Sequence, residues 1–395
     1  RLNFVWYFGF DYDNERFIIM RKAVSLLIIL FLGNSLNAQE FFRETKKQKE
    51  ERMEWWTESR FGMFIHFGLY SMPAEHAWYK NRNRMNNEEY RKYFEHFDPD
   101  LLDAGEWARL AKESGMKYMV ITTKHHDGFC LWDTEYTDYK VTNTPYGKDI
   151  IREVVNAFRE EGIRVGFYYS MIDWHHPEYT TDHKHPLRDD SAYVALDKSR
   201  DMSVYREYMH NQIRELLTGY GKVDLFFSDF SFVSQEGYPG KGKDDWGSME
   251  ILKMIRTLQP ECIINDRLDL MDVQGGWDIR TPEQFMPREW VRYEGSRVPW
   301  ETGQTLSGKW TYATQQHAEW RSEEQLVSML IEVVSKGGNL LLNAGPDGRG
   351  RIDPVSSRLL HDMGTWMELH KRSIYGCTAA PESMVSTGGT MLSYN

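Results

Sequence analysis

Short apolar runs alternate with amphipathic segments through most of the chain, and this alternation is the main indication of its fold. The apolar runs are Gly62-Met-Phe-Ile-His-Phe, Tyr118-Met-Val-Ile-Thr-Thr, Arg164-Val-Gly-Phe-Tyr-Tyr, Asp224-Leu-Phe-Phe-Ser, Cys262-Ile-Ile-Asn and Asn339-Leu-Leu-Leu-Asn. Each run is predicted to form a strand. Strands that are apolar almost without interruption are typical of a parallel sheet whose faces are covered by helices.

Helical segments with recognisable ends lie between these runs. They cover 103–114, 149–161, 205–220 and 322–336, and a glycine directly follows each of them. A glycine just past the end and a capping box such as Ser322-x-x-Gln at the start are signals that bound helices. About six strand-and-helix units over about 320 residues predict an α/β fold of the (β/α)₈-like, or TIM-barrel, type. An open doubly wound sheet is less expected, because the sequence has no glycine-rich dinucleotide fingerprint.

The first forty residues have the pattern of a processed leader. Met20 is followed by Arg-Lys, by an apolar stretch and by Ala38 at a plausible cleavage point, which is the order of a secretory signal peptide. The apolar stretch of about ten residues is short for a membrane span, although an uncleaved anchor is the alternative. We therefore expect a secreted or periplasmic protein that is not inserted in the membrane after cleavage. The expected divisions are read-through upstream of the true start at 1–19, a signal peptide at 20–38, a barrel domain at 39–375 and a final stub at 376–395.

Charge and cysteine content narrow the classes of function. Asp and Glu number 59 against 48 Lys and Arg, which gives a formal net charge of −11. Nucleic acid is not an expected partner, because its binding needs a concentrated basic surface. The three cysteines, Cys130, Cys262 and Cys377, form no CxxC pair and no zinc-type cluster, so neither a metal nor another cofactor is predicted. The 14 Trp, 22 Tyr and 20 Phe suit a ligand with apolar faces and polar edges, such as a sugar.

Polar side chains follow the predicted strands at the edge where barrel enzymes carry their chemistry. They are His66, Lys124-His125-His126, Tyr168, Tyr169, Asp229 and Asn265-Asp266-Arg267. A lone histidine or aspartate at such a position is more often structural. Here, however, several separate strand ends supply His, Tyr, Asp and Arg, which can grip or transform a polar ligand.

Two chemistries fit this set of side chains. Metal-assisted hydrolysis usually has a His-x-His pair on the first strand, where this chain offers only His66. Glycoside hydrolysis needs two carboxyl groups, one as nucleophile or base and the other as proton donor. Asp229 ends an apolar run and is one candidate, while Glu283 and Glu301 are both candidates for the second carboxyl. Spacing alone does not choose between these two glutamates.

A family resemblance is carried by short motifs spread in order along the chain. They are Gly62-Met-Phe-Ile-His-Phe-Gly-Leu-Tyr-Ser-Met-Pro-Ala, Lys124-His-His-Asp-Gly-Phe, Phe227-Ser-Asp, Asn265-Asp-Arg, Trp300-Glu-Thr and Lys336-Gly-Gly-Asn-Leu-Leu-Leu-Asn-Ala-Gly-Pro. Together they resemble glycoside hydrolase family 29, the α-L-fucosidases, over residues 54–376. The resemblance implies an exo-acting, retaining α-L-fucosidase on a (β/α)₈-like barrel. Such an enzyme hydrolyses terminal α-L-fucose from fucosylated oligosaccharides or glycoconjugates by double displacement, through a covalent glycosyl-enzyme intermediate.

The resemblance also implies roles for individual residues. Asp229 matches the family nucleophile, Glu283 is the favoured acid/base, and Glu301 is the runner-up. The residues implied in substrate binding are His66, Trp78, His125, His126, Tyr168, Phe227, Arg267 and Trp310. Histidines, tyrosine and arginine would hydrogen-bond the fucose hydroxyls or the nucleophile, and Trp310 would pack on the face that bears the methyl group.

Some positions depart from the family pattern. Ala77 stands where the family often has a glutamate, Phe227 where many members have tryptophan, and Thr311 where glycine is common. The loss of a hydroxyl-binding carboxylate favours, as alternatives, a related α-L-glycosidase such as one acting on α-L-galactosides, or an inactive fucose-binding protein. Family members usually continue into a C-terminal β-sandwich, so residues 376–395 are expected to be the stub of an absent or truncated domain.

Overall fold

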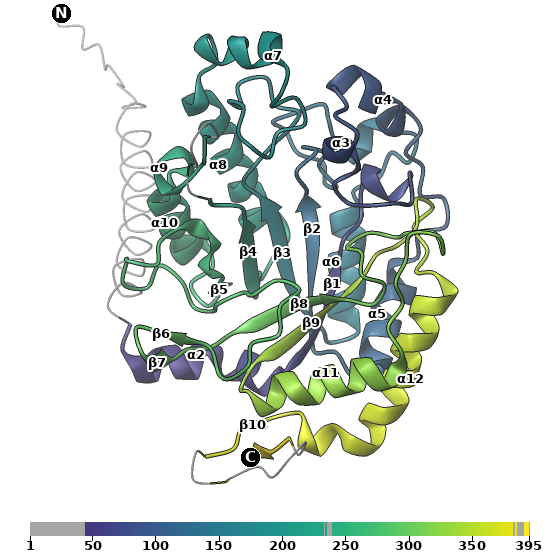
Figure 1. Ribbon diagram of the computed structural model, residues 1–395, viewed down its shortest axis with the longest axis vertical. Helices are drawn as coiled ribbons and strands as arrows, with labels where there is room; N and C mark the ends of the chain where they lie inside the picture. The colour runs from purple at the N-terminus through teal and green to yellow at the C-terminus, as the bar shows by residue number, and fades with distance from the viewer. Residues whose placement is uncertain (1–43, 233, 235–238, 382–383, 385–390, 395) are drawn as a thin grey trace, which may run out of the picture.

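The computed structural model describes residues 44–232, 234, 239–381, 384 and 391–394 (Figure 1). The predicted read-through at 1–19 and the signal peptide at 20–38 lie outside the described residues. Within the described ranges no helix is both long enough and apolar enough to cross a membrane.

A parallel sheet of seven strands forms the centre of the molecule. The strands are β1 (Phe61–Ile65), β2 (Tyr118–Lys124), β3 (Arg164–Ser170), β4 (Leu225–Asp229), β5 (Ile263–Ile264), β8 (Glu301–Thr305) and β9 (Asn339–Ala344). Their order is β5-β4-β3-β2-β1-β9-β8, and all neighbouring pairs are parallel. Gly62 of β1, for example, pairs with Tyr118 of β2 on one side and with Leu341 of β9 on the other.

The segment 279–283 fills the gap between the two edge strands of this sheet. Isolated parallel bridges join Asn265 to Ile279, Arg280 to Trp300, and Glu283 to Gly303. The segment therefore runs beside the end of β5 on one side and beside β8 on the other, and it takes the place of an eighth strand. The predicted (β/α)₈-like barrel is confirmed, and the closing segment carries Glu283 to the carboxyl end of the barrel wall.

The helices surround the barrel or cover its ends (Figure 1). Those that cover the outer wall are α5 (Ala104–Glu113), α6 (Ile150–Glu160), α8 (Met202–Gly219), α10 (Ser248–Leu258), α11 (Glu323–Ser335) and α12 (Pro354–His370). The shorter α3 (Tyr79–Arg82), α4 (Asn87–Glu95), α7 (Ser191–Ala195) and α9 (Lys243–Trp246) lie in the long connections. The predicted capping box at Ser322 is present, whereas the helix expected from 205 begins three residues earlier, because Asp201 caps it.

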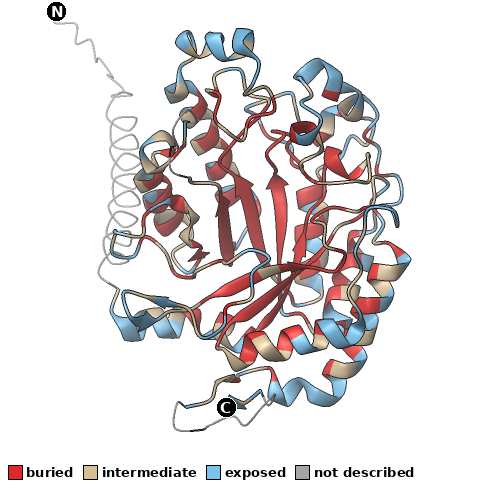
Figure 2. Ribbon diagram, viewed as in Figure 1, coloured by how far each residue is buried: buried red, intermediate tan, exposed pale blue. Residues whose placement is uncertain are grey.

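Two apolar cores lie on the two sides of the barrel wall. Figure 2 shows that the strands of the wall are buried and that the surrounding helices have buried and exposed faces. Along β2, Tyr118 and Val120 belong to the core inside the barrel, and Met119 and Ile121 to the core beneath the helices. The helix α2 (Lys46–Ser59) closes the amino-terminal end and contributes Trp56 to the inner core. Apolar side chains therefore fill the barrel at its amino-terminal end, and the carboxyl ends of the strands are left as the place for a ligand.

Two short antiparallel pairs complete the described structure. The first joins β6 (Arg292–Tyr293) to β7 (Ser296–Arg297), and the second joins β10 (Thr378–Ala379) to β11 (Ser393–Tyr394). The second pair belongs to the predicted stub at 376–395 and packs beside α11. That this segment starts a β-sandwich stays a prediction.

Candidate active site

A pocket with a cavity volume of about 50 Å³ opens at the carboxyl ends of the barrel strands. Its lining residues are Phe64, His66, Trp78, His125, His126, Tyr168, Phe227, Asp229, Phe230, Arg267, Thr281, Pro282, Glu283, Gly303 and Trp310. Every residue to which the family resemblance gave a role is in this set, apart from Glu301. Of the other polar residues expected at the strand ends, Lys124, Tyr169, Asn265 and Asp266 do not line the pocket. The rule that parallel strands end at one edge is what brings these distant positions together.

Asp229 is the last residue of β4 and is held by donors on both carboxylate oxygens. Its side chain lines the pocket, and the residue is 5% exposed. The hydroxyl of Tyr168 donates to Oδ2 at 2.6 Å, and Nη1 of Arg267 donates to Oδ1. Burial raises the pKa of Tyr168 well above its ordinary value, so this hydroxyl keeps the proton that it donates. The guanidinium balances the charge of a carboxylate that would otherwise be costly to bury.

Glu283 stands opposite Asp229 and shares its partner. The same Nη1 of Arg267 donates to Glu283 Oε2 at 3.0 Å. Because one nitrogen hydrogen-bonds an oxygen of each group, the two oxygens lie within about 6 Å of each other. Desolvation raises the pKa of Glu283, the guanidinium of Arg267 lowers it, and the negative charge of Asp229 raises it, with a net upward direction. Glu283 keeps 45% of its side chain exposed, so it forms the open side of the pocket.

The three pocket histidines are neutral rings, and neighbouring polar groups fix two of them, His66 and His126. His66 Nδ1 lies 2.7 Å from Asn343 Oδ1, and His126 Nδ1 lies 2.8 Å from Ser170 Oγ. Burial lowers the pKa of His66 to about 3 and that of His125 and His126 well below the ordinary value. A neutral imidazole has one donor and one acceptor nitrogen. Because Nδ1 is already bonded in His66 and His126, each of these rings has Nε2 left for a sugar hydroxyl.

Aromatic rings close the remaining walls. Trp310 stacks on His66 with centroids 4.9 Å apart, and Trp78 meets His126 edge-on at 5.1 Å. Phe227 stacks on Tyr168 at 5.7 Å. The pocket thus combines apolar faces with a few oriented polar groups, the composition of a site for a small carbohydrate.

The motifs, the barrel and this pocket agree with a comparison of the whole sequence with protein families. The family model described as Alpha-L-fucosidase matches residues 29–372. The chain belongs to the α-L-fucosidase family.

Relatives and solved structures of this family match over most of their length. An α-L-fucosidase of Dictyostelium discoideum is 28% identical over 386 residues, which cover 90% of this chain and 78% of that protein. α-L-Fucosidase isoenzyme 1 from Paenibacillus thiaminolyticus is 45% identical with a TM-score of 0.79, covering 85% of this chain and 79% of that chain. A GH29 α-L-fucosidase from Bacteroides thetaiotaomicron is 31% identical with a TM-score of 0.72, and the match covers 83% of this chain and 77% of that chain. Its structure is that of a trapped covalent intermediate in complex with 2-fluoro-fucosyl fluoride, obtained with a variant in which glutamine replaces a glutamate.

Sequence reasoning missed several residues that shape this fucosidase-family pocket. Asn343 is the last residue but one of β9, binds His66 through its Oδ1 and donates from Nδ2 to the Trp310 carbonyl at 2.5 Å. Its place at a strand end could have revealed it. Phe230 packs on His126 at 4.9 Å, and its backbone has a φ of +78°. No sequence signal marks Phe230, because non-glycine residues rarely adopt this left-handed conformation and do so where the surroundings impose it.

The departures from the family pattern have different structural settings. Ala77 is buried within the inner core. Because its side chain is a methyl group, the position offers no carboxylate to a ligand. Thr311 lies outside the pocket lining, and its hydroxyl is 3.0 Å from Ser71 Oγ. The threonine therefore makes a buried internal hydrogen bond and does not contact the fucosidase-family pocket.

Glu301 does not reach the pocket. It is the first residue of β8, so it lies at the amino-terminal end of the barrel, where it is 0% exposed. The hydroxyl of Tyr118, the first residue of β2, donates to Glu301 Oε2. Burial raises the pKa of Glu301 to about 7. The motif Trp300-Glu-Thr starts a strand and does not end one, and this is why the runner-up acid/base candidate is far from Asp229.

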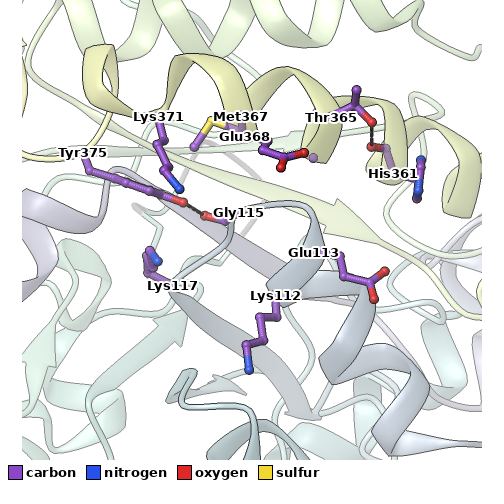
Figure 3. A pocket seen from close by; sticks show the side chains of 11 residues that line it. Lys112, Glu113, Gly115, Lys117, His361, Thr365, Met367, Glu368, Lys371 and Tyr375 are labelled. Atoms are coloured by element: carbon purple, nitrogen blue, oxygen red, sulfur yellow. Dashed lines mark hydrogen bonds between the residues drawn. The ribbon is translucent and has the colours of Figure 1, made fainter.

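A larger hollow, with a cavity volume of about 390 Å³, lies between α12 and the turn from α5 into β2 (Figure 3). Lys112, Lys117 and Lys371 project around it, and Tyr375 donates to the Gly115 carbonyl (Figure 3). Its surface is open, and it lies at the amino-terminal side of the sheet. Among the described residues no group of three or more His, Cys, Asp or Glu side chains is placed to hold a metal ion.

Proposed function

We propose that the protein is an exo-acting, retaining α-L-fucosidase that removes terminal α-L-fucose from fucosylated oligosaccharides or glycoconjugates. The observation that carries this proposal is that Asp229 and Glu283 bind one nitrogen of Arg267 within the pocket. Retaining glycosidases place their two carboxyl groups about 5 to 5.5 Å apart, whereas inverting enzymes need a wider gap for a water molecule. The shared nitrogen supports the closer spacing.

In the proposed first step Asp229 is the nucleophile and Glu283 the acid. A carboxylate oxygen of Asp229 attacks the anomeric carbon, the glycosidic C–O bond breaks, and Glu283 gives its proton to the leaving oxygen. The products are a fucosyl ester on Asp229 and a free alcohol from the aglycone. The raised pKa of Glu283 supports this role, because it favours the protonated carboxyl that the step requires.

In the second step the ester is hydrolysed. Glu283, now a carboxylate, takes a proton from water, and the water oxygen attacks the anomeric carbon to release L-fucose and the Asp229 carboxylate. Tyr168 and Arg267 donate to the two oxygens of Asp229 and can stabilise the charge when this carboxylate leaves. We assign the neutral rings of His66, His125 and His126 to the fucose hydroxyls. The aromatic walls of Trp78, Phe227 and Trp310 are assigned to its apolar surface, including the methyl group.

The experiment compares release of nitrophenol from nitrophenyl α-L-fucoside by the native protein and by Asp229→Ala. We expect turnover by the native protein and loss of about 10⁴-fold or more in the variant, because the covalent step is removed. Thr311→Ser is the matched control, since it lies outside the pocket and keeps the hydroxyl that bonds Ser71. Absent native turnover, or full turnover by Asp229→Ala, contradicts the proposal.

A related α-L-glycosidase activity is the second candidate, and the buried Ala77 favours it, because it supplies no carboxylate to read a hydroxyl. A panel of nitrophenyl glycosides that includes the α-L-galactoside separates the two, and a higher kcat/KM for the galactoside selects the alternative. An inactive fucose-binding protein instead predicts heat of fucose binding in calorimetry with no hydrolysis of any member of the panel.

We further propose that the protein is exported, with a signal peptide near residues 20–38. The support is the order of charged, apolar and small residues that ends at Ala38. Expression from Met20 followed by amino-terminal sequencing of the secreted product should find a start near Gln39. A protein that stays in the cell fraction with its leader uncleaved contradicts the proposal of export.

A further inference from the structure

Two buried side chains behind the pocket determine where the ring protons of its histidines lie. Asn343 contacts His66 and Ser170 contacts His126, in both cases at Nδ1 of the ring. Asn343 belongs to β9 and Ser170 to β3, and neither is among the residues that line the pocket. A neutral imidazole has one donor and one acceptor nitrogen, so the group bonded at Nδ1 decides which of the two Nε2 is.

The hydroxyl of Ser170 can only accept from His126. It has a single proton, and it donates this proton to the carbonyl of Ile172 at 2.7 Å. A carbonyl oxygen has no proton to give, so Ser170 Oγ meets His126 Nδ1, 2.8 Å away, with a lone pair. The proton of this neutral ring is therefore on Nδ1, and Nε2 is a bare acceptor.

The amide of Asn343 has the same effect on His66. Its Nδ2 lies 2.5 Å from the carbonyl oxygen of Trp310, and a flipped amide would bring two oxygens together at that distance. The orientation of the amide is therefore fixed, and Oδ1, which only accepts, is the atom 2.7 Å from His66 Nδ1. His66 thus also has its proton on Nδ1. His125, by contrast, has no partner at Nδ1 among the described residues.

The position of the proton has its largest consequence beside the proposed nucleophile. Nε2 of His126 lies 3.9 Å from Asp229 Oδ2, and burial keeps the ring neutral by lowering its pKa well below the ordinary value. A proton on Nε2 would let the ring hydrogen-bond this carboxylate, and a carboxylate with a further donor is a weaker nucleophile. A bare Nε2 makes no such bond and is left to accept from a sugar hydroxyl.

We propose that Ser170 and Asn343 are positioning residues for the proposed fucosidase reaction, on which this inference rests. They hold the rings of His126 and His66 with the proton on Nδ1, so that both rings accept from fucose hydroxyls and donate to none. The pocket then requires a ligand group that gives a proton at each of the two positions. A substituent that only accepts would leave a buried ring nitrogen unpaired, which is unfavourable.

The first measurement reads the ring protons directly and needs no substrate. Nitrogen NMR of the protein with isotope-labelled histidine distinguishes a ring that has its proton on Nδ1 from one that has it on Nε2. The variants His126→Gln and His66→Gln identify the two signals. We expect the Nδ1–H form for both rings in the native protein. The Nε2–H form in either ring overturns the proposal.

The second measurement tests the positioning role of Ser170. Ser170→Ala leaves the Nδ1 proton of His126 buried without an acceptor, whereas a proton on Nε2 would face Asp229, so the ring should change to the Nε2–H form. We expect kcat/KM for nitrophenyl α-L-fucoside to fall about tenfold. Ser170→Thr keeps the hydroxyl and should restore the Nδ1–H form and the activity. Ser114→Ala removes another buried hydroxyl that donates to a backbone carbonyl, outside the pocket, and should change neither.

The third measurement asks whether the sugar hydroxyls act as donors. Deoxy and deoxyfluoro analogues of L-fucose are compared with L-fucose as competitive inhibitors, because fluorine accepts weakly and cannot donate. At two of the ring hydroxyls fluorine should weaken inhibition about tenfold, as much as removal of the hydroxyl does. In Asn343→Ala the ring of His66 is no longer fixed, and the difference between fucose and its fluoro analogue should shrink at one of these positions.

Several outcomes overturn the proposal. A loss of activity in Ser170→Ala with the proton still on Nδ1 shows that Ser170 only supports the fold, and a moved proton with unchanged activity shows that the reaction does not depend on it. Fluoro analogues that inhibit as well as fucose at every hydroxyl exclude the acceptor role. If Ser170→Ala does not fold, the native spectrum and the native inhibition panel still decide. Failure of the proposed function is distinguishable, because the native protein then releases no nitrophenol, while the spectrum is read without substrate.

Discussion

The buried carboxyl of Glu301 makes a sharp prediction about how stability depends on pH. Glu301 is fully buried at the start of β8, and the one hydrogen bond to its carboxyl group in the described structure is donated by Tyr118. Among the described residues neither Glu301 Oε1 nor the nearby Trp56 Nε1 has a hydrogen-bond partner of normal geometry. The surroundings therefore favour the neutral acid, and burial raises its pKa from 4.5 to about 7.

The sign and size of the effect follow from this shift. Between pH 4.5 and about 7 the folded protein keeps the proton on Glu301 while the unfolded chain has lost it. The contribution of Glu301 to the free energy of unfolding is therefore greatest below about pH 4.5. It falls by about 3 kcal/mol in total as the pH rises to about 7. Above that range the folded protein holds an ionised carboxylate, and the loss stays constant. The substitution Glu301→Gln keeps the shape and cannot ionise, so it should remove this dependence.

The assay is urea unfolding of the native protein, Glu301→Gln and Tyr118→Phe, followed by tryptophan fluorescence between about pH 5 and pH 8. Near pH 5 the native protein and Glu301→Gln should differ by about 1 kcal/mol or less, and near pH 8 the glutamine variant should be more stable by about 3 kcal/mol. Tyr118→Phe retains the carboxyl and should retain the pH dependence. Activity of Glu301→Gln on the fucoside should stay within about twofold, because Glu301 is outside the pocket. Parallel pH profiles for the native protein and Glu301→Gln would refute the reasoning.

Other predictions concern the pocket and its surroundings. Glu283→Gln should lower kcat/KM for a disaccharide by about 10² to 10⁴-fold but lower that for α-L-fucosyl fluoride much less, since fluoride leaves without a proton; equal losses on both substrates argue against an acid role. Arg267→Met removes the charge that holds both carboxyl groups and should lower kcat by about 10²-fold or more. Calorimetry of fucose binding checks the variant, because a collapsed pocket would no longer bind fucose. Thr311→Gly should lower the free energy of unfolding by about 1 to 2 kcal/mol through loss of the bond to Ser71, with kcat/KM unchanged; altered fucoside kinetics would show that Thr311 does touch the site.

The fold was predictable to the extent that strands were apolar. The six apolar runs all became strands of the barrel, and helix ends at 103, 149 and 322 were found because side-chain caps mark them. The two remaining parts of the wall carry little apolar sequence. The closing segment reads Ile-Arg-Thr-Pro-Glu, and β8 reads Glu-Thr-Gly-Gln-Thr. Such segments are extended because the neighbouring strands hold them in place, and hydrophobic periodicity does not report this.

The choice between Glu283 and Glu301 could not be made from the sequence for the same reason. Both glutamates lie in the two polar segments, which are neighbours in the barrel wall and run in the same direction. The side of the barrel that each one reaches depends on whether it begins or ends its segment. Glu283 pairs with Gly303, two residues beyond Glu301, and lies at the carboxyl end beside Asp229. A carboxyl at the end of its segment meets Arg267 and the pocket, whereas one at the start meets Tyr118 and a closed core. The position of each glutamate within its own polar segment therefore separates the proposed proton donor from a buried carboxyl outside the pocket.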